Sequence, residues 1–204
     1  MSTLDLRVRY FQDSTPAGVP CREESCQRRE ISMALPVEQT AFVLVDVWNT
    51  HFIESWLERA KRVTVEAVVP ALEAARSIGL TVAHAPAPEV AKQYPQLARH
   101  APPPQSPTPS WPPAEFRRRE GDYAAFRGPR DQPPSIHVHW DELAPRLGMS
   151  PAIAVLEDDE VIATGQQLHD LLAARRILHL IYCGFATNWC IMHRDYGVTM
   201  ACGP

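Results

Sequence analysis

Four short apolar segments, each about the length of a buried strand, dominate the hydrophobic pattern of this chain. They cover residues 41–45, 80–84, 152–156 and 177–183. The first segment is apolar on both faces, which is typical of a central parallel strand covered by helices. It is followed by Asp46, and the third segment is followed by Glu157. The pattern therefore predicts four internal strands, two of which end on a carboxylate.

Helical spacing of apolar residues connects these segments. Residues 54–78 predict a long helix that Pro70 should kink or split and that Gly79 ends. Residues 166–175 predict a second helix just before the fourth strand. The resulting order of strand, helix, strand, insertion, strand, helix, strand and helix indicates an α/β fold with a mainly parallel sheet.

Two regions depart from this pattern. Residues 1–38 are polar and irregular, so we expect an N-terminal arm with one edge strand, near the alternating residues Leu6–Phe11. The domain itself covers residues 39–204 and contains an insertion at about 95–135, which holds eleven of the twenty prolines. That composition predicts an extended segment lying over the body, as a lid or a subunit contact. The chain ends soon after the helix that follows the fourth strand, so the C-terminus is expected to be short or truncated.

Length and charge limit the function classes. A chain of 204 residues fits one domain, and its net charge of −4 gives no indication of nucleic-acid binding. No apolar stretch approaches the length of a membrane span, and the first residues lack the apolar region of a signal peptide. Five cysteines without zinc-type spacing favour a reducing cytoplasm. We expect a small-molecule substrate, no cofactor, no bound metal and a homo-oligomer.

Cys190 is the candidate nucleophile. It follows the fourth strand and a glycine-containing turn, in a segment where Thr187 or Asn188 could cap a helix. In the first turn of such a helix, free N–H groups and the helix dipole favour a thiolate and could hold an oxyanion. The alternative is a small buried hydrophobic residue, which is what most free cysteines are. Position alone does not separate the two.

Other polar residues fall near the same predicted edge of the sheet. Asp46 ends a central strand, where α/β enzymes place their chemistry, although a helix cap would explain it as well. His84 ends the second strand and could face the same pocket, but a structural role is more common for a lone histidine. His137 and His139 alternate, which would place both rings on one face of a short strand; two histidines are a weak metal signal.

Asp46 together with the segment Gly184-Phe185-Ala186-Thr187-Asn188-Trp189-Cys190 resembles the isochorismatase-like cysteine hydrolases, a family that includes nicotinamidases and N-carbamoylsarcosine amidases. The resemblance covers about residues 38–204 apart from the insertion. It implies a three-layer αβα Rossmann-like sandwich, usually oligomeric, with an Asp–Lys–Cys triad. It also implies an oxyanion hole from the N–H groups of Ala186 and Cys190, and a cis peptide between Phe185 and Ala186.

The triad lysine has no clear counterpart. Counting back from Cys190 without a gap places Glu157 at its position, which would give an Asp46–Glu157–Cys190 site. The only lysines are Lys61, within the first helix, and Lys92, a poor substitute beyond the second strand. A second carboxylate should raise carboxylate pKa values and disfavour the thiolate, although two carboxylates that share a proton can still transfer it.

Three functions remain open on this basis. The first is a cysteine-dependent hydrolase of a small amide or related C–N bond, with Cys190 as nucleophile and Asp46 as base. The second is a catalytically silent relative kept for binding or assembly, and the third is an isochorismatase-type vinyl-ether hydrolase. The predicted substrate pocket contains aromatic and polar residues that would suit a flat ligand: Trp48, His51, His84, Thr187, Asn188 and Trp189.

Overall fold

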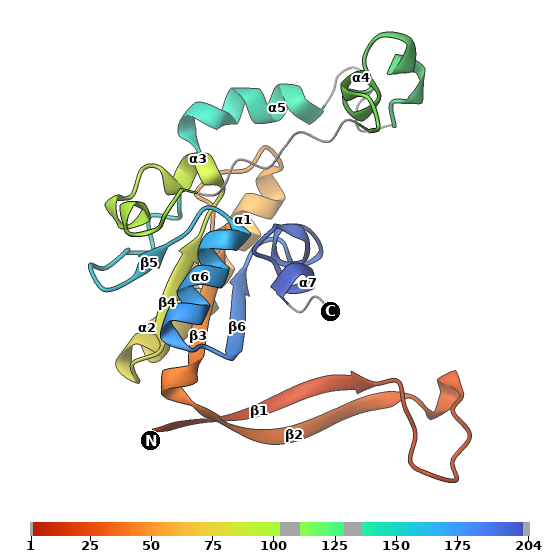
Figure 1. Ribbon diagram of the computed structural model, residues 1–204, viewed down its shortest axis with the longest axis vertical. Helices are drawn as coiled ribbons and strands as arrows, with labels where there is room; N and C mark the ends of the chain where they lie inside the picture. Colours follow the sequence, from red (N-terminus) through yellow and green to blue (C-terminus); the bar gives the residue numbers. More distant parts are fainter. Residues whose placement is uncertain (1, 103–110, 129–135, 202–204) are drawn as a thin grey trace.

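The computed structural model describes residues 2–102, 111–128 and 136–201, and it contains a parallel sheet of four strands in the order β5-β4-β3-β6 (Figure 1). The strands are β3 (Thr40–Val45), β4 (Thr81–Ala85), β5 (Glu160–Val161) and β6 (His179–Gly184). β3 pairs in parallel with β4 on one side and with β6 on the other. The predicted α/β class with a parallel sheet is confirmed, and β3 is the central, fully buried strand.

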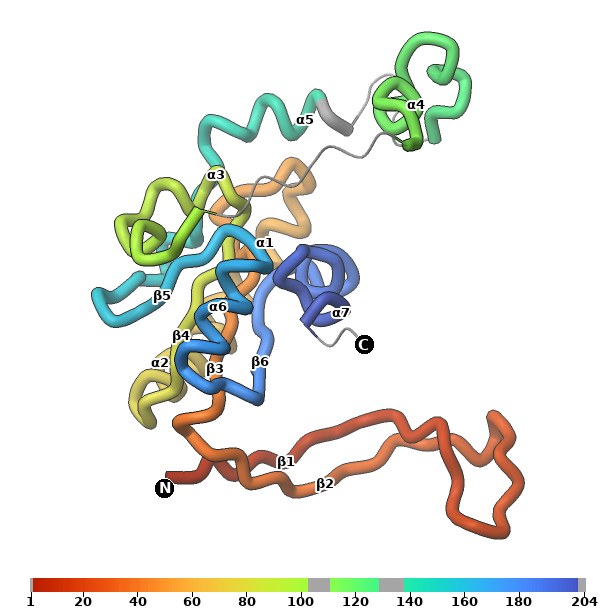
Figure 2. The backbone as a smooth tube through the Cα atoms, in the orientation of Figure 1, coloured from red at the N-terminus to blue at the C-terminus, as the bar shows by residue number. Residues whose placement is uncertain are grey.

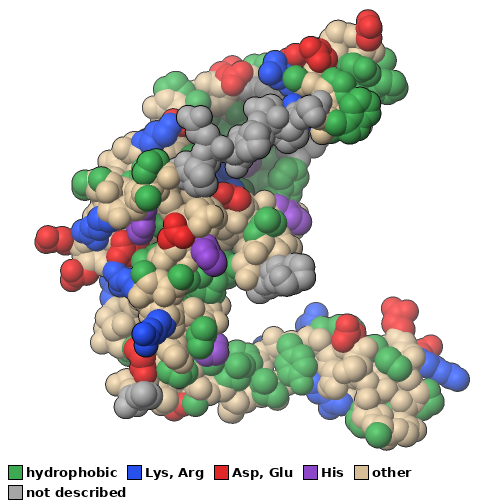
Figure 3. Space-filling model, viewed as in Figure 1, with side chains coloured by type: hydrophobic (Ala, Val, Ile, Leu, Met, Phe, Trp, Pro, Cys, Tyr) green, Lys and Arg blue, Asp and Glu red, His purple; other side chains and the backbone are tan. Residues whose placement is uncertain are grey.

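The N-terminal arm is more regular than the sequence pattern suggested. Residues 3–36 form an antiparallel hairpin of two ten-residue strands, β1 (Thr3–Gln12) and β2 (Gln27–Pro36), with the short helix η1 (Glu23–Ser25) in its loop. The strand expected near Leu6–Phe11 is present as part of β1, whereas β2 was not expected. Apolar residues alternate with polar ones in both strands and give the hairpin one apolar face. The hairpin joins the body at its base and extends away from it (Figures 2 and 3).

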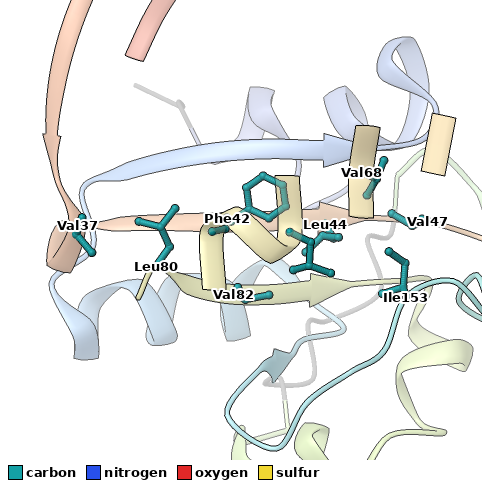
Figure 4. Close-up of a cluster of buried hydrophobic side chains, with 10 residues drawn as sticks. Val37, Phe42, Leu44, Val47, Val68, Leu80, Val82 and Ile153 are labelled. Carbon is teal, nitrogen blue, oxygen red and sulfur yellow. The ribbon is translucent and has the colours of Figure 1, made fainter. Parts of the chain in front are cut away.

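Helices cover both faces of the sheet. The helix expected over residues 54–78 is divided into α1 (Glu54–Val63), the π-helical turn η3 (Thr64–Val68) and α2 (Val69–Ser77), with Pro70 in the first turn of α2 as anticipated. One core cluster joins this face to alternate residues of β3 and β4 (Figure 4); its members include Phe42, Leu44, Val68, Leu72, Leu80 and Val82.

The opposite face is covered by α6 (Gly165–Arg175), whose N-cap is Thr164. There Val43 and Val45 of β3 pack with Leu168 and Leu171 of α6. Successive side chains of β3 therefore point alternately into two cores, as expected for a strand that is buried on both faces. None of the described helices has the length and apolar character needed to cross a bilayer.

The insertion is mostly short helical turns rather than extended chain. Its described parts, with the residues around them, contain the elements α3 (Pro88–Ala91), η4 (Pro95–Arg99), α4 (Ala114–Arg118), η5 (Gly121–Phe126), α5 (Ile136–Leu143) and η6 (Ala144–Arg146), whereas η2 (Val37–Gln39) lies directly before β3. The strand expected at His137–His139 is wrong, since these residues belong to α5. Residues 103–110 and 129–135 of the predicted insertion, and Cys202, lie outside the described residues.

The third predicted strand is also wrong. Residues 152–156 lie in a loop, and the strand that pairs with β4 is the two-residue β5, which begins at Glu160. The loop is held by Asp159, whose buried carboxylate lies 3.0 Å from His84 Nε2, accepts the Leu156 N–H at 2.9 Å and forms an ion pair with Arg76. Burial opposes ionisation of this carboxyl, but the bonds from His84, Arg76 and Leu156 hold its pKa at about 2.

We predict that Asp159→Asn lowers the free energy of unfolding by about 2–3 kcal/mol. The substitution removes the negative charge that pairs with Arg76 of α2, and it removes a carboxylate oxygen that also contacts His84 of β4 and the loop N–H of Leu156. Chemical denaturation at neutral pH measures the loss. The matched control is Asp158→Asn, which makes the same change at the exposed neighbouring position and should leave stability within about 0.5 kcal/mol.

The pH dependence tests the same network. Because the folded pKa of about 2 lies below the value of an unfolded aspartate, the contribution of Asp159 is complete above about pH 4 and is lost as pH falls toward 2. The parent chain should therefore lose about 2 kcal/mol more than Asp159→Asn over this window. Equal losses in both proteins would contradict the assignment.

Candidate active site at the carboxyl ends of β3 and β6

The site lies at the point in the sheet where the connections between strands change from one face to the other. The connection from β3 leads to β4 over one face, and the connection from β5 through α6 returns over the other face to β6, on the far side of β3. In open α/β sheets ligands bind outside the carboxyl ends of the strands at such a switch point. Asp46 follows β3 and Cys190 follows β6, so the fold brings the two predicted residues to this point.

Asp46 is buried and has a left-handed backbone conformation, with φ of 46°. Aspartate tolerates this conformation better than most residues. Its N–H donates to the Ala85 carbonyl at 3.1 Å, and its own carbonyl accepts the Trp48 N–H at 2.8 Å. These bonds turn the chain sharply after β3 and hold the carboxylate at the edge of the sheet.

Gly184 allows the chain after β6 to approach β3. It has φ of 134°, and a Cβ atom there would lie 1.8 Å from the Val45 carbonyl oxygen. No other residue fits this approach. The N–H of Phe185 donates to the same oxygen at 3.0 Å, and the peptide bond between Phe185 and Ala186 is cis, as the family resemblance implied.

Cys190 lies in the π-helical segment η7 (Thr187–Ile191). Ala186 occupies the N-cap position without a side-chain cap bond, so the predicted capping by Thr187 or Asn188 is wrong. Burial, the charge of Asp46 and the hydrogen bond from the thiol to Asp46 raise the pKa of Cys190 to about 11. Arg194 and the N–H of Ala186 act in the opposite direction. The resting group is a thiol, not the thiolate that the helix terminus was expected to favour.

Arg194 is the cation of the site, and sequence analysis did not identify it. Its Nε and Nη2 atoms lie 2.9 and 2.8 Å from the same Asp46 oxygen, Oδ2. Burial lowers the pKa of Arg194, but the charge of Asp46 and the hydrogen bond to it outweigh this, so the pKa of Arg194 is raised. The signal was its position four residues after Cys190, which places both side chains on one side of a helical segment.

The segment that carries Arg194 is fixed by its neighbours. The Tyr196 hydroxyl donates to the Pro86 carbonyl at 2.8 Å, and the Tyr182 hydroxyl donates to the Tyr196 carbonyl at 2.9 Å. The side chain of Asp195 accepts the N–H of Gly165 at 2.7 Å, at the start of α6. These bonds connect the segment to β4, β6 and α6, so the guanidinium is held against Asp46.

Glu157 is not part of this arrangement. It lies in the exposed turn before β5, where its backbone carbonyl accepts a bond from Arg99. The gap-free count from Cys190 failed because residues 152–156 form no strand. Lys92 also lies elsewhere, exposed and paired with Glu89 at 2.8 Å, and Lys61 belongs to α1. The predicted carboxylate pair is therefore replaced by the Asp46–Arg194 ion pair.

Two clefts meet at Cys190. The first, about 220 Å³, is lined by Asp46, Arg194 and Cys190 together with Gly148 and surrounding apolar residues: Val47, Trp48, Pro86, Ala87, Val90, Trp140, Leu147 and Met149. The second, about 370 Å³, is mainly aromatic and is lined by Trp48, His51, Phe52, Ile53, Trp56, Trp140, Ala186, Trp189 and Cys190. Trp48, Trp140 and Cys190 belong to both.

The remaining predicted pocket residues divide between the clefts and other places. His51 packs between aromatic rings, with its centroid 5.1 Å from Trp48 and 5.2 Å from Trp56, and burial lowers its pKa. His84 is fully buried against Asp159, so its expected place in the pocket is wrong. Thr187 and Asn188 are exposed and line neither cleft. Among the described residues, no group of three or more histidine, cysteine or acidic side chains is placed to hold a metal ion.

Comparison of the chain with protein-family models, with curated proteins and with solved structures found no match in any of the three.

Proposed function

We propose that the protein is a cysteine-dependent hydrolase of a C–N bond in a small amide, built on an isochorismatase-like, three-layer Rossmann-like fold. The observation that carries the proposal is the grouping of three residues at the switch point of the sheet: Cys190, Asp46 and Arg194 line one cleft, Asp46 acts on the Cys190 thiol, and Arg194 holds that carboxylate. Nucleophilic catalysis requires a nucleophile beside a base, with a third group that orients the base.

In the first half-reaction Asp46 accepts the proton of the Cys190 thiol as the sulfur attacks the amide carbonyl carbon. The C–S bond forms and the carbonyl π electrons move to oxygen. The N–H of Ala186, which faces the sulfur, is placed to stabilise this oxyanion. The protonated Asp46 then gives its proton to the nitrogen, the C–N bond breaks, and ammonia or an amine leaves an acyl thioester.

In the second half-reaction water replaces the amine. Asp46 accepts a proton from the water as its oxygen attacks the thioester carbonyl, and the C–S bond breaks. The sulfur regains a proton from Asp46, and the product is a carboxylic acid. Arg194 stays charged throughout, because a guanidinium is not deprotonated in proteins, so its role is to orient Asp46 and lower the pKa of Cys190.

The two clefts favour an amide that carries a flat aromatic group. The reacting carbonyl must lie at Cys190, between the ion pair on one side and the aromatic cleft on the other. Trp48, His51 and Trp56 offer ring faces to a planar group, and aromatic pairs contribute about 0.5–1.5 kcal/mol beyond buried area. The aromatic cleft is large enough for a single or fused ring.

A second candidate function is ligand binding without turnover. The observation in its favour is the pKa of Cys190 near 11, which leaves little thiolate at neutral pH. Asp46 and the clefts would then serve recognition only. Binding of aromatic amides, detected by tryptophan fluorescence, without release of amine would identify this case.

Alkylation of Cys190 should test the state of the thiol directly. With a pKa of about 11, iodoacetamide should label it at pH 7 about 100-fold more slowly than an unperturbed cysteine. Asp46→Asn removes the negative charge beside the thiol and weakens the hydrogen-bond acceptor, so the pKa of Cys190 should fall. Labelling at pH 7 should then become at least about tenfold faster. Peptide-resolved mass spectrometry separates Cys190 from the other four cysteines.

Arg194→Gln provides the opposite control, because loss of the guanidinium should raise the pKa of Cys190 and slow its labelling further. Cys21 is exposed and distant from this site, so its rate serves as an internal standard in every variant. If Asp46→Asn labels no faster than the parent chain, the thiol–carboxylate contact is not the one we describe.

Hydrolysis should depend on the same three groups. In a screen of aryl and alkyl primary amides followed by ammonia release, Cys190→Ser and Asp46→Asn should each lose at least about 1,000-fold in kcat. Arg194→Lys, which keeps a cation, should retain more activity than Arg194→Gln. Turnover that survives Cys190→Ser would refute the covalent mechanism.

The aromatic cleft predicts a difference between substrates. Trp56→Ala should raise KM about tenfold for an aromatic amide and leave KM for a short aliphatic amide unchanged, since only the ring reaches Trp56. Trp56 is partly exposed, so the change should not unfold the chain. The matched control is Trp111→Ala, at an exposed position in the turn before α4, which should leave KM unchanged for both substrates. Equal effects of Trp56→Ala on KM for the two substrates would argue against the assignment.

A further inference from the structure

The two clefts that meet at Cys190 contain different polar groups. The Asp46 carboxylate belongs to the lining of the first cleft and not to that of the aromatic cleft. Ala186, whose N–H faces the Cys190 sulfur, belongs to the lining of the aromatic cleft and not to that of the first. The nucleophile thus has a hydrogen-bond acceptor toward one cleft and a hydrogen-bond donor toward the other.

These two groups orient an amide that is bound at Cys190. An ionised carboxylate only accepts hydrogen bonds, so Asp46 can face the N–H of the amide and not its carbonyl oxygen. The N–H of Ala186 only donates, so it faces the carbonyl oxygen. The amide nitrogen and any group attached to it then lie toward the first cleft, and the acyl group lies toward the aromatic cleft. The same orientation places Asp46 beside the nitrogen that it must protonate.

The first cleft is much larger than a primary amide needs. Its volume is about 220 Å³, whereas a molecule of the size of water or ammonia needs only about 10–15 Å³ of such space. Its two charged residues, Asp46 and Arg194, pair with each other, and the rest of the lining is mostly apolar. Val47, Val90 and Met149 in that lining are almost fully buried. Such walls would stabilise an alkyl group on the nitrogen, because they remove it from water, and they offer nothing to ammonia.

Hydrogen bonds between backbone segments fix one wall of the first cleft. The N–H of Asn49 donates to the Gly148 carbonyl, and the N–H of Gly148 donates to Asn49 Oδ1, both at 3.0 Å. The N–H of Ser150 donates to the Val47 carbonyl at 2.7 Å. These bonds join residues 148–150 to the residues that follow β3. The cleft is therefore pre-formed, and it can select the group on the nitrogen by its length.

The aromatic cleft suits the other half of the amide. Trp48, Trp56 and Trp189 contribute indole rings to its lining, and its volume is about 370 Å³. The flat aromatic group of the substrate therefore belongs on the acyl carbon and not on the nitrogen.

We propose that the substrate is a secondary amide that joins an aromatic acyl group to an alkylamine, which rests on the hydrolase function proposed above. The aromatic acyl group occupies the aromatic cleft, and the N-alkyl group occupies the first cleft, beside Asp46. Water cleaves the C–N bond: its hydroxyl goes to the acyl carbon and its proton to the nitrogen. The products are an aromatic carboxylic acid and an alkylamine. Primary amides, which leave the first cleft unfilled, are weaker substrates.

Two isomeric amides test the orientation. N-propylbenzamide carries its ring on the acyl carbon, and N-phenylbutanamide carries the same ring on the nitrogen. Isothermal titration calorimetry should show at least about tenfold tighter binding of N-propylbenzamide to Cys190→Ala, and the parent chain should hydrolyse it with at least about tenfold higher kcat/KM. Intrinsic reactivity gives the reverse order, because aniline is the better leaving group. Equal affinities, or tighter binding of N-phenylbutanamide, overturn the proposal.

A series from benzamide to N-butylbenzamide tests the first cleft. Each added methylene should strengthen binding to Cys190→Ala and raise kcat/KM of the parent chain about fourfold, because each is buried against apolar walls. Ala87→Leu fills part of the cleft and should remove this gain for the longer chains. The matched control is Ala98→Leu, at an exposed position in η4 that lines neither cleft, which should keep the gain. Circular dichroism should show that both variants remain folded.

The binding and turnover measurements separate this proposal from the hydrolase function. Turnover of benzamide without a gain from N-alkyl groups in either measurement overturns the secondary-amide substrate and leaves the hydrolase function in place. A gain in affinity that Ala87→Leu removes, with no amine released by the parent chain, supports the assignment of the two clefts and refutes hydrolysis.

Discussion

The close approach of Gly184 to the Val45 carbonyl is the constraint on which the site depends. β3 and β6 pair along their length, but a side chain at residue 184 would separate them where both strands end. Without a Cβ there, the Phe185 N–H reaches the same carbonyl and the chain turns directly into η7. This contact brings Cys190, which is far from Asp46 in sequence, into the same cleft as Asp46. The chemistry of the site therefore depends on backbone packing before it depends on side chains.

Arg194 changes the electrostatic character that the sequence suggested. A second carboxylate beside Asp46 would have made the site strongly negative, whereas the guanidinium balances the carboxylate and leaves one neutral thiol beside the pair. The cation comes from the segment after the nucleophile and not from the strand before it. The position of a cation in the sequence is a weak guide to its role, because its effect on the pKa of the nucleophile depends only on its distance from the reacting atoms.

The sequence predicted the elements whose signals are local and strong. β3, β4, β6 and α6 follow from apolar runs and helical spacing, and Asp46 and Cys190 from their places after the strands. The third strand was misplaced because the apolar run 152–156 is a loop held by the Asp159 network, while β5 has only two residues. Of the hairpin, the alternating residues within β1 were recognised as a strand, whereas β2 was missed because it begins with four polar residues, Gln27–Glu30. Glu157 was placed in the site by a count that assumed a strand.

The nature of the cation also decides how protons can move. A lysine beside Asp46 could in principle exchange a proton with substrate, but the guanidinium of Arg194 cannot. Both transfers in each half-reaction therefore fall on Asp46, which must be anionic before the thiol attacks and protonated before the amine leaves. Arg194 binds the Oδ2 atom of Asp46 through two nitrogens, so the carboxylate is held in one orientation beside Cys190. The ion pair thus fixes where the base lies.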